Sequence, residues 1–141
     1  MKTLLFLAGL LSVPALAVAQ QAVPGTGPAV VKWHNASHTA YFGDPAEWAR
    51  FQMLLSTEEF REIRQGSEGQ TSLRVEGDHL ILTGCMVPAC NSTRAGLAVA
   101  VDTGDALAVI WQRDRQPRIF GAQLAGLPPA LRALAESGAL E

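Results

Sequence analysis

The stretch that decides the fold is residues 94–111, Arg94-Ala-Gly-Leu-Ala-Val-Ala-Val-Asp-Thr-Gly-Asp-Ala-Leu-Ala-Val-Ile-Trp111. Alternation of large and small apolar side chains over residues 94–101 and 106–111 predicts two β-strands, and the polar residues 102–105 predict the turn of a hairpin. Each strand is apolar on both faces, one bulky and one mostly small, which is typical of a strand covered on both sides. We therefore expect a central position in a sheet, with helices on the small face and more helix or a second subunit on the other.

A second hairpin precedes this one. Residues 72–75 alternate between polar and apolar side chains, residues 76–78 predict a turn, and residues 79–83 predict a strand that leads into Cys85. Cys90 follows after four further residues. In an exported protein this pair is most simply a disulfide, because zinc sites need more ligands and redox pairs usually stand two residues apart. A ring of six residues contributes only about 2 kcal/mol through chain entropy, so we expect the bond to shape a loop.

The loop between the cysteines consists of Met86, Val87, Pro88 and Ala89. Its apolar tip, held by Pro88 and by the disulfide, is suited to insertion into a cavity of a partner, because part of the ordering cost is met before binding. Alternatively, the tip packs on its own domain as a structural corner. The residues alone leave both interpretations open.

Helix signals occur on both sides of these strands. Asp44 with Glu47, and Ser56 with Glu59, have the spacing of capping boxes and predict two short helices or one bent helix. A last helix is expected after residues 128–129, a pair of prolines.

The N-terminus predicts export. Residues 1–19 combine Lys2, an apolar run and the small residues Ala17 and Ala19, which is the order of a cleaved signal peptide. The apolar run of about 15 residues is shorter than the roughly 20 that cross a bilayer, so we expect a periplasmic protein without a membrane anchor. Residues 20–43, rich in Pro and Gly at their start, are expected to form a flexible leader, and residues 44–141 a single domain.

The charge of the chain argues against a nucleic-acid-binding protein. The formal net charge is −2, and the loss of Lys2 with the signal peptide makes it more negative. Nucleic-acid binding requires a basic stripe that displaces counterions. The one local cluster, Arg113, Arg115 and Arg118, is interrupted by Asp114 and is expected to be a solvated turn.

Few residues suggest catalysis. His34 and His38 have the spacing of two metal ligands on a helix, but no acid or third His accompanies them, and the default interpretation is two solvated histidines. The sequence contains no nucleophile motif and no Gly-rich phosphate loop after a strand. We therefore expect a protein that is not an enzyme and needs neither a cofactor nor a metal.

The pattern of residues 72–94, with two strands around a turn and then Cys85 and Cys90 four residues apart, resembles the inhibitor of vertebrate lysozyme (Ivy) family, as do the strands at 97–101 and 106–111. The resemblance implies an α+β fold with a central antiparallel sheet, flanking short helices and a protruding loop closed by the disulfide. It also implies a periplasmic location, a lysozyme as partner and a possible homodimer.

The family's loop reads Cys-Lys-Pro-His-Asp/Asn-Cys, and its His enters the lysozyme cleft to engage the catalytic carboxylates. Here Met86 replaces the Lys, Val87 the Pro, Pro88 the His and Ala89 the acid or amide. The resemblance therefore implies the fold, whereas inhibition through a loop His does not follow.

Three hypotheses about function remain. The first is a periplasmic inhibitor of a lysozyme or another peptidoglycan-cleaving hydrolase, acting through the loop of Met86, Val87, Pro88 and Ala89. The second is a non-inhibitory envelope protein that keeps the Ivy-like fold and uses its sheet face for a dimer or another partner. The third, a small hydrolase or metal carrier, would depend on His34 and His38.

Overall fold

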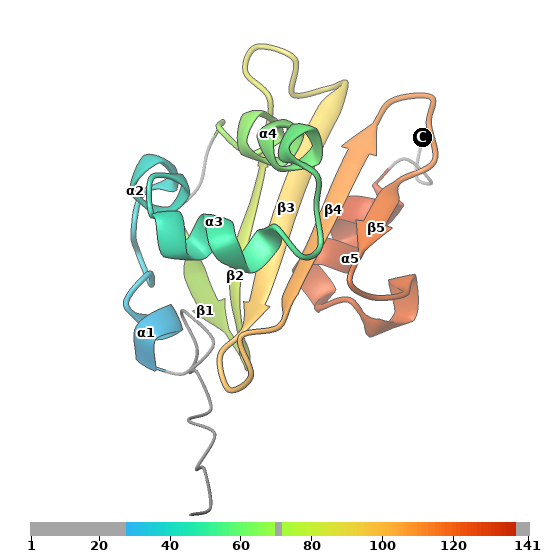
Figure 1. Cartoon of the computed structure of the whole chain (residues 1–141). Coiled ribbons are helices and arrows are strands. Elements are labelled where there is room, and N and C mark those ends of the chain that lie inside the picture. The colour runs from blue at the N-terminus through green and yellow to red at the C-terminus, as the bar shows by residue number, and fades with distance from the viewer. Residues whose placement is uncertain (1–27, 70–71, 138–141) are drawn as a thin grey trace, which may run out of the picture.

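Within residues 28–69 and 72–137, which the computed structural model describes, five strands form one antiparallel sheet in the order β1-β2-β3-β4-β5 (Figure 1). The strands are β1 (Arg74–Glu76), β2 (His79–Cys85), β3 (Thr93–Ala100), β4 (Ala106–Gln112) and β5 (Arg118–Phe120). The helices are α1 (Pro28–Val31), α2 (His38–Phe42), α3 (Pro45–Phe51), α4 (Thr57–Gly66), the 3-10 turn η1 (Leu124–Gly126) and α5 (Pro129–Glu136). The predicted α+β fold, with a central antiparallel sheet and flanking short helices, is confirmed.

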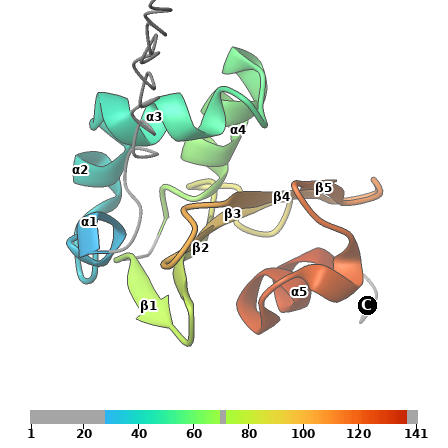
Figure 2. The same cartoon turned by 60° about the horizontal axis from the view of Figure 1, so that its bottom comes forward.

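Helices cover both faces of the sheet (Figure 2). On one face α1 to α4 pack against β2, β3 and β4. The hydrophobic core between them includes the buried side chains of Phe51 and Leu97. On the other face Leu131 and Leu134 of α5 pack against Val109 and its neighbours. The prediction that β3 and β4 are covered on both sides is correct, and within the described residues this chain supplies both covers itself.

The prediction of one bulky and one small face was wrong for the sheet as a whole. Leu97 of β3 lies opposite Ala108 of β4, and Ala98 lies opposite Leu107. Directly opposite residues of an antiparallel pair share a face, so large side chains of one strand meet small ones of the next on both faces. The helices on each side therefore pack against a mixture of sizes.

The two predicted helix starts behave differently. Ser56 and Glu59 form the expected capping box at the start of α4. Asp44 caps α3 by accepting from the backbone nitrogens of Ala46 and Glu47, but the side chain of Glu47 does not return to the cap, because it is buried among other donors. None of the helices in the described ranges is long and apolar enough to cross a membrane.

The prediction of a flexible leader over residues 20–43 was wrong for residues 28–43. These form α1 and α2, and Val30 and Tyr41 are completely buried in the core. The connection between the helices pairs with the chain before β1, because Asn35 N donates to Leu73 O (2.7 Å) and Leu73 N donates to Ala36 O (3.1 Å). The domain therefore begins before Asp44. The predicted signal peptide, residues 1–19, and residues 20–27 lie outside the described residues.

Candidate binding loop

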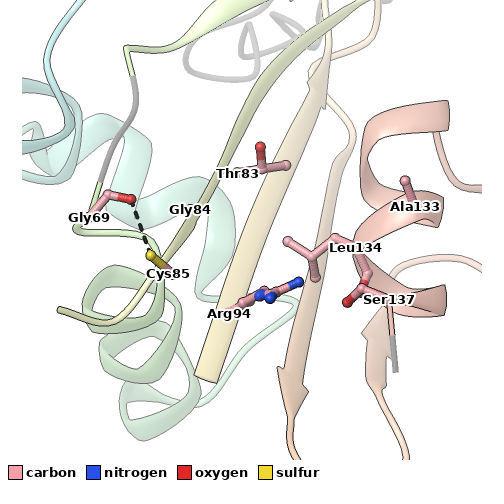
Figure 3. A pocket seen from close by; sticks show the side chains of 8 residues that line it. All are labelled: Gly69, Thr83, Gly84, Cys85, Arg94, Ala133, Leu134 and Ser137. Carbon is pink, nitrogen blue, oxygen red and sulfur yellow. Dashed lines mark hydrogen bonds between the residues drawn. The ribbon is translucent and has the colours of Figure 1, made fainter. Parts of the chain in front are cut away.

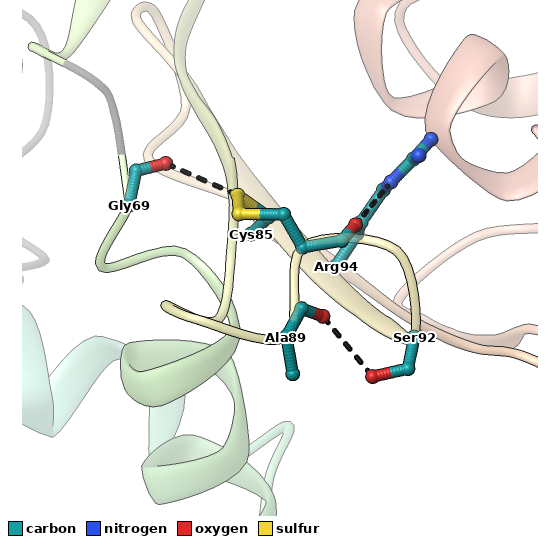
Figure 4. The surroundings of a disulfide bond; sticks show 6 residues. Gly69, Cys85, Ala89, Ser92 and Arg94 are labelled. Carbon is teal, nitrogen blue, oxygen red and sulfur yellow. Dashed lines mark hydrogen bonds between the residues drawn. A yellow bond between two sulfur atoms is a disulfide. The ribbon is translucent and has the colours of Figure 1, made fainter.

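The loop predicted from the two cysteines joins β2 to β3 at one end of the sheet (Figure 1). Cys85 is the last residue of β2 and forms the predicted disulfide with Cys90, with 4.7 Å between the two Cα atoms (Figure 4). The covalent closure thus begins where the strand pairing ends.

Hydrogen bonds close the loop a second time. The carbonyl oxygen of Ala89 accepts from the backbone nitrogens of Ser92 (3.0 Å) and Thr93 (3.1 Å), and from Ser92 Oγ (3.1 Å). Across the base, Met86 N donates to Thr93 O (3.0 Å). The returning half of the loop therefore has a defined turn of its own, independent of the disulfide.

Two neighbouring segments hold the base of the loop. Gly69, after α4, exchanges two backbone hydrogen bonds with Cys85, of 2.8 and 3.3 Å. A side chain at position 69 would place its Cβ only 2.5 Å from Val87 Cγ2, so glycine is needed for this close approach. On the other side Arg113 N, in the β4–β5 turn, donates to Ser92 O (2.9 Å).

A third support comes from Arg94, the second residue of β3. Its Nε donates to Cys90 O (3.1 Å), and its guanidinium lies over the ring of Trp111, 5.2 Å from the centroid. The strand register explains both contacts, because Arg94 lies opposite Cys85 of β2 on one side and opposite Trp111 of β4 on the other. The loop is thereby tied to the buried core of β4.

The four predicted loop residues differ in exposure. Val87 is 62% exposed and Pro88 is also exposed, whereas Met86 and Ala89 are half-buried. The Val87–Pro88 peptide is cis. The structure therefore presents an apolar tip of two residues, with no titratable side chain among the four.

The histidines do not form the pair that their spacing suggested. His34 lies in the turn after α1 and its Nδ1 accepts from Val75 N (3.0 Å), whereas His38 begins α2 and its Nε2 lies 2.8 Å from Arg64 O and 3.1 Å from Ser67 Oγ. Burial lowers the pKa of His38, and its hydrogen bond to Arg64 O opposes this. His38 is thus half-buried and not freely solvated as expected. The described residues contain no group of three or more His, Cys, Asp or Glu side chains able to hold a metal ion.

A buried polar cluster, which the sequence analysis did not find, lies away from the loop. Glu47 accepts hydrogen bonds of 3.1 Å from Trp33 Nε1, Tyr41 Oη and Arg50 Nε, and Arg50 Nη1 donates to Gly104 O (2.6 Å). Burial, and then the adjacent carboxylate, raise the pKa of Tyr41. These contacts connect the turn after α1, and the helices α2 and α3, to the β3–β4 turn, so we assign the cluster a structural role.

Sequence analysis missed two arrangements, the buried cluster around Glu47 and the support of the loop by Arg94. The sequence contained a signal for the first of them. Glu47 falls on the apolar side of α3 near Trp48 and Phe51, where a carboxylate needs buried donors. Arg94 offered none, because its contacts with Cys90 and Trp111 follow from the strand register.

The sequence of this chain is similar to a known protein family. The sequence model of the family described as inhibitor of vertebrate lysozyme (Ivy) matches residues 47–139. The matched range includes α4, the whole sheet, the loop and α5. Comparisons with curated proteins and with solved structures gave no match.

Proposed function

Because the chain belongs to the inhibitor of vertebrate lysozyme (Ivy) family, we propose that it inhibits a lysozyme or another peptidoglycan-cleaving hydrolase by docking the loop closed by Cys85 and Cys90. Membership implies lysozyme inhibition in general and places the chain in a family of inhibitors, not of enzymes. The observation that carries the proposed mode of binding is the exposed apolar tip, Val87 and Pro88, on a base fixed by a disulfide and by backbone hydrogen bonds.

The tip suggests steric occlusion. The side chains of Met86, Val87, Pro88 and Ala89 carry no charge and no hydrogen-bonding group, so they cannot pair with the carboxylates that glycosidases use at the scissile bond. A rigid apolar wedge can still exclude the polysaccharide from a cleft. Its affinity comes from desolvation of the tip and from the small ordering cost of a loop that is already closed.

The alternative, a non-inhibitory envelope protein that binds through its sheet face, has less support. Within the described residues α1 to α4 cover one face of the sheet and α5 covers the other. A partner would have to bind over the helices or at a sheet edge. A homodimer remains a prediction, as do the signal peptide over residues 1–19 and the periplasmic location.

The test is a cell-wall clearing assay with protein purified after export, its disulfide intact, against a panel of c-type lysozymes and bacterial lytic hydrolases. Val87→Asp should weaken inhibition of the sensitive enzyme at least tenfold, because truncating or charging a central contact costs about 2 kcal/mol or more. Val31→Asp is the matched control, since Val31 is 44% exposed on α1, away from the loop. It should inhibit like the parent protein.

Two results would contradict the proposal. If the parent protein inhibits no enzyme of the panel, inhibition itself is refuted. If an enzyme is inhibited equally by the parent protein and by Val87→Asp and Pro88→Asp, the protein is an inhibitor that acts through another surface.

A further inference from the structure

A depression lies beside the base of the loop, between the sheet and α5 (Figure 3). Its volume is about 420 Å³, within the range of small-ligand sites. The strands contribute Gly84 and Arg94 to its wall, α5 contributes Ala133 and Leu134, and Ser137 follows as the C-cap of that helix. Among the described residues that line it, Arg94 is the one charged residue and none is acidic.

Arg94 is half-buried, and no residue in the described part of the chain pairs with it through a carboxylate. Other half-buried or buried arginines of the described chain are paired, Arg50 with Glu47 and Arg118 with Glu62. For Arg94, the described residues offer only the carbonyl oxygen of Cys90 and the ring of Trp111. A partly desolvated cation that lacks a counter-charge favours an anionic ligand.

The geometry also orients the guanidinium. The hydrogen bond to Cys90 O occupies Nε, and the buried ring of Trp111, 6% exposed, fixes the plane from one side. No described residue accepts from the two Nη nitrogens, and no buried side-chain nitrogen is left without a partner, so these two donors are accessible to solvent. An arginine held in this way offers two parallel N–H groups, which match the two oxygens of a carboxylate.

The remaining wall restricts the ligand. Ser137 Oγ already donates its proton to Leu134 O (2.7 Å), and of the described lining residues Arg94 is the one that offers a cationic donor to a negative charge. Leu134 and Ala133 provide apolar contacts next to it.

We propose that this depression is a carboxylate-binding site in which Arg94 binds the carboxylate and α5 contacts a small aliphatic group attached to it. The ligand is either a free small acid or an acidic group on a protein that docks at the loop. Because Arg94 also holds the carbonyl of Cys90, a ligand here contacts a residue that supports the loop.

An NMR titration of ¹⁵N-labelled protein, purified after export, tests the site directly. The probes are N-acetyl-alanine and N-acetyl-alanine amide, which differ in charge but hardly in size. The acid should give saturable shifts at Arg94 Nε and at the amides of residues 133–137, and the amide should bind at least tenfold more weakly, since hydrogen bonds to charged groups are worth more than 1.4 kcal/mol. Equal binding of the two probes would overturn the proposal.

Three variants test whether the preference for the acid depends on Arg94 and on the depression beside it. Arg94→Gln should lose the preference for the acid. Arg132→Gln should keep it, although the guanidinium of Arg132, a residue of α5, also donates to backbone carbonyls, those of Ala125 and Leu127. Ala133→Glu leaves the contacts of Arg94 with Cys90 and Trp111 in place and supplies a competing carboxylate, so it should also abolish binding. Acid binding that survives in both Arg94→Gln and Ala133→Glu would refute the site.

Competition distinguishes the two sources of the carboxylate. If N-acetyl-alanine, and not its amide, displaces a hydrolase that the protein binds, the site receives an acidic group of that enzyme. If the acid binds but displaces nothing, the ligand is a free acid. A positive titration with a protein that inhibits no hydrolase would leave this inference standing and refute only the proposed function.

Discussion

Replacing Cys85 and Cys90 together by serine removes the covalent closure of the loop and leaves its other supports in place. A closed ring of six residues reduces the entropy of the unfolded chain by an amount worth about 2 kcal/mol. Domains of this size are stable by roughly 5–15 kcal/mol, so the variant should remain folded. Its melting temperature should fall by roughly 5–12 °C.

The contacts that remain confine the effect to the loop. Gly69 still pairs with position 85, Met86 N still donates to Thr93 O, and Arg94 still holds the carbonyl of residue 90. Amide exchange should therefore accelerate between residues 86 and 92 and stay unchanged in the centre of β3 and β4. Inhibition should weaken, because binding must then order the loop.

Thermal unfolding with and without a thiol reductant measures the change in melting temperature. A separate hydrogen-exchange experiment measures the local opening of the loop. The parent protein should lose stability on reduction, and the double-serine variant, which has no disulfide, serves as the control and should not respond. Global unfolding of the variant at 25 °C would show that the bond stabilises the whole fold, and the argument from ring size would be refuted. An unchanged melting temperature would refute it equally.

Three further predictions concern buried groups outside the loop. Glu47→Gln should destabilise the fold by about 3–5 kcal/mol in urea unfolding, because it removes the carboxylate from the buried ion pair with Arg50. Glu58→Gln, at an exposed pair, should change stability by less than about 1 kcal/mol. The pKa of His38 is lowered by burial, so the stability it contributes is complete above its ordinary value of 6.5 and is lost as the pH falls through the folded value; His38→Gln should flatten unfolding free energy against pH in that window. The pKa of Tyr41 is raised, so stability should decline above pH 10.0, where the unfolded chain loses the phenol proton first, and Tyr41→Phe should remove this decline.

Local signals in the sequence predicted the elements well. The capping box at Ser56 needs only residues within one helical turn, and the strands around Leu97 and Val109 follow from alternation over a few residues. Where such a local pattern gave a wrong prediction, a tertiary contact had replaced the local hydrogen bond. Glu47 has the spacing of a capping box, but its carboxylate is taken by Trp33 and Tyr41.

Long-range contacts could not be predicted in the same way. Residues 28–43 have no clear periodicity and follow a segment rich in Pro and Gly, so they were expected to be flexible. Their order depends on burial of Val30 and Tyr41 and on pairing with Leu73, which is distant in sequence. The faces of the sheet were likewise mistaken because the register, and not either strand alone, places Leu97 opposite Ala108.

The way in which the loop is held explains how its tip can depart from the family's pattern while the fold is kept. Apart from the disulfide itself, the loop residues Met86, Ala89 and Cys90 contribute only backbone groups to their supports; the two side-chain donors, Ser92 Oγ and Arg94 Nε, lie outside the ring. Backbone groups are the same for every residue except proline, which lacks the N–H, and Pro88 stands at a position whose nitrogen none of these supports uses. Changing the tip side chains therefore changes what the loop presents to a partner without changing what holds it, and Val87→Asp should fold like the parent protein.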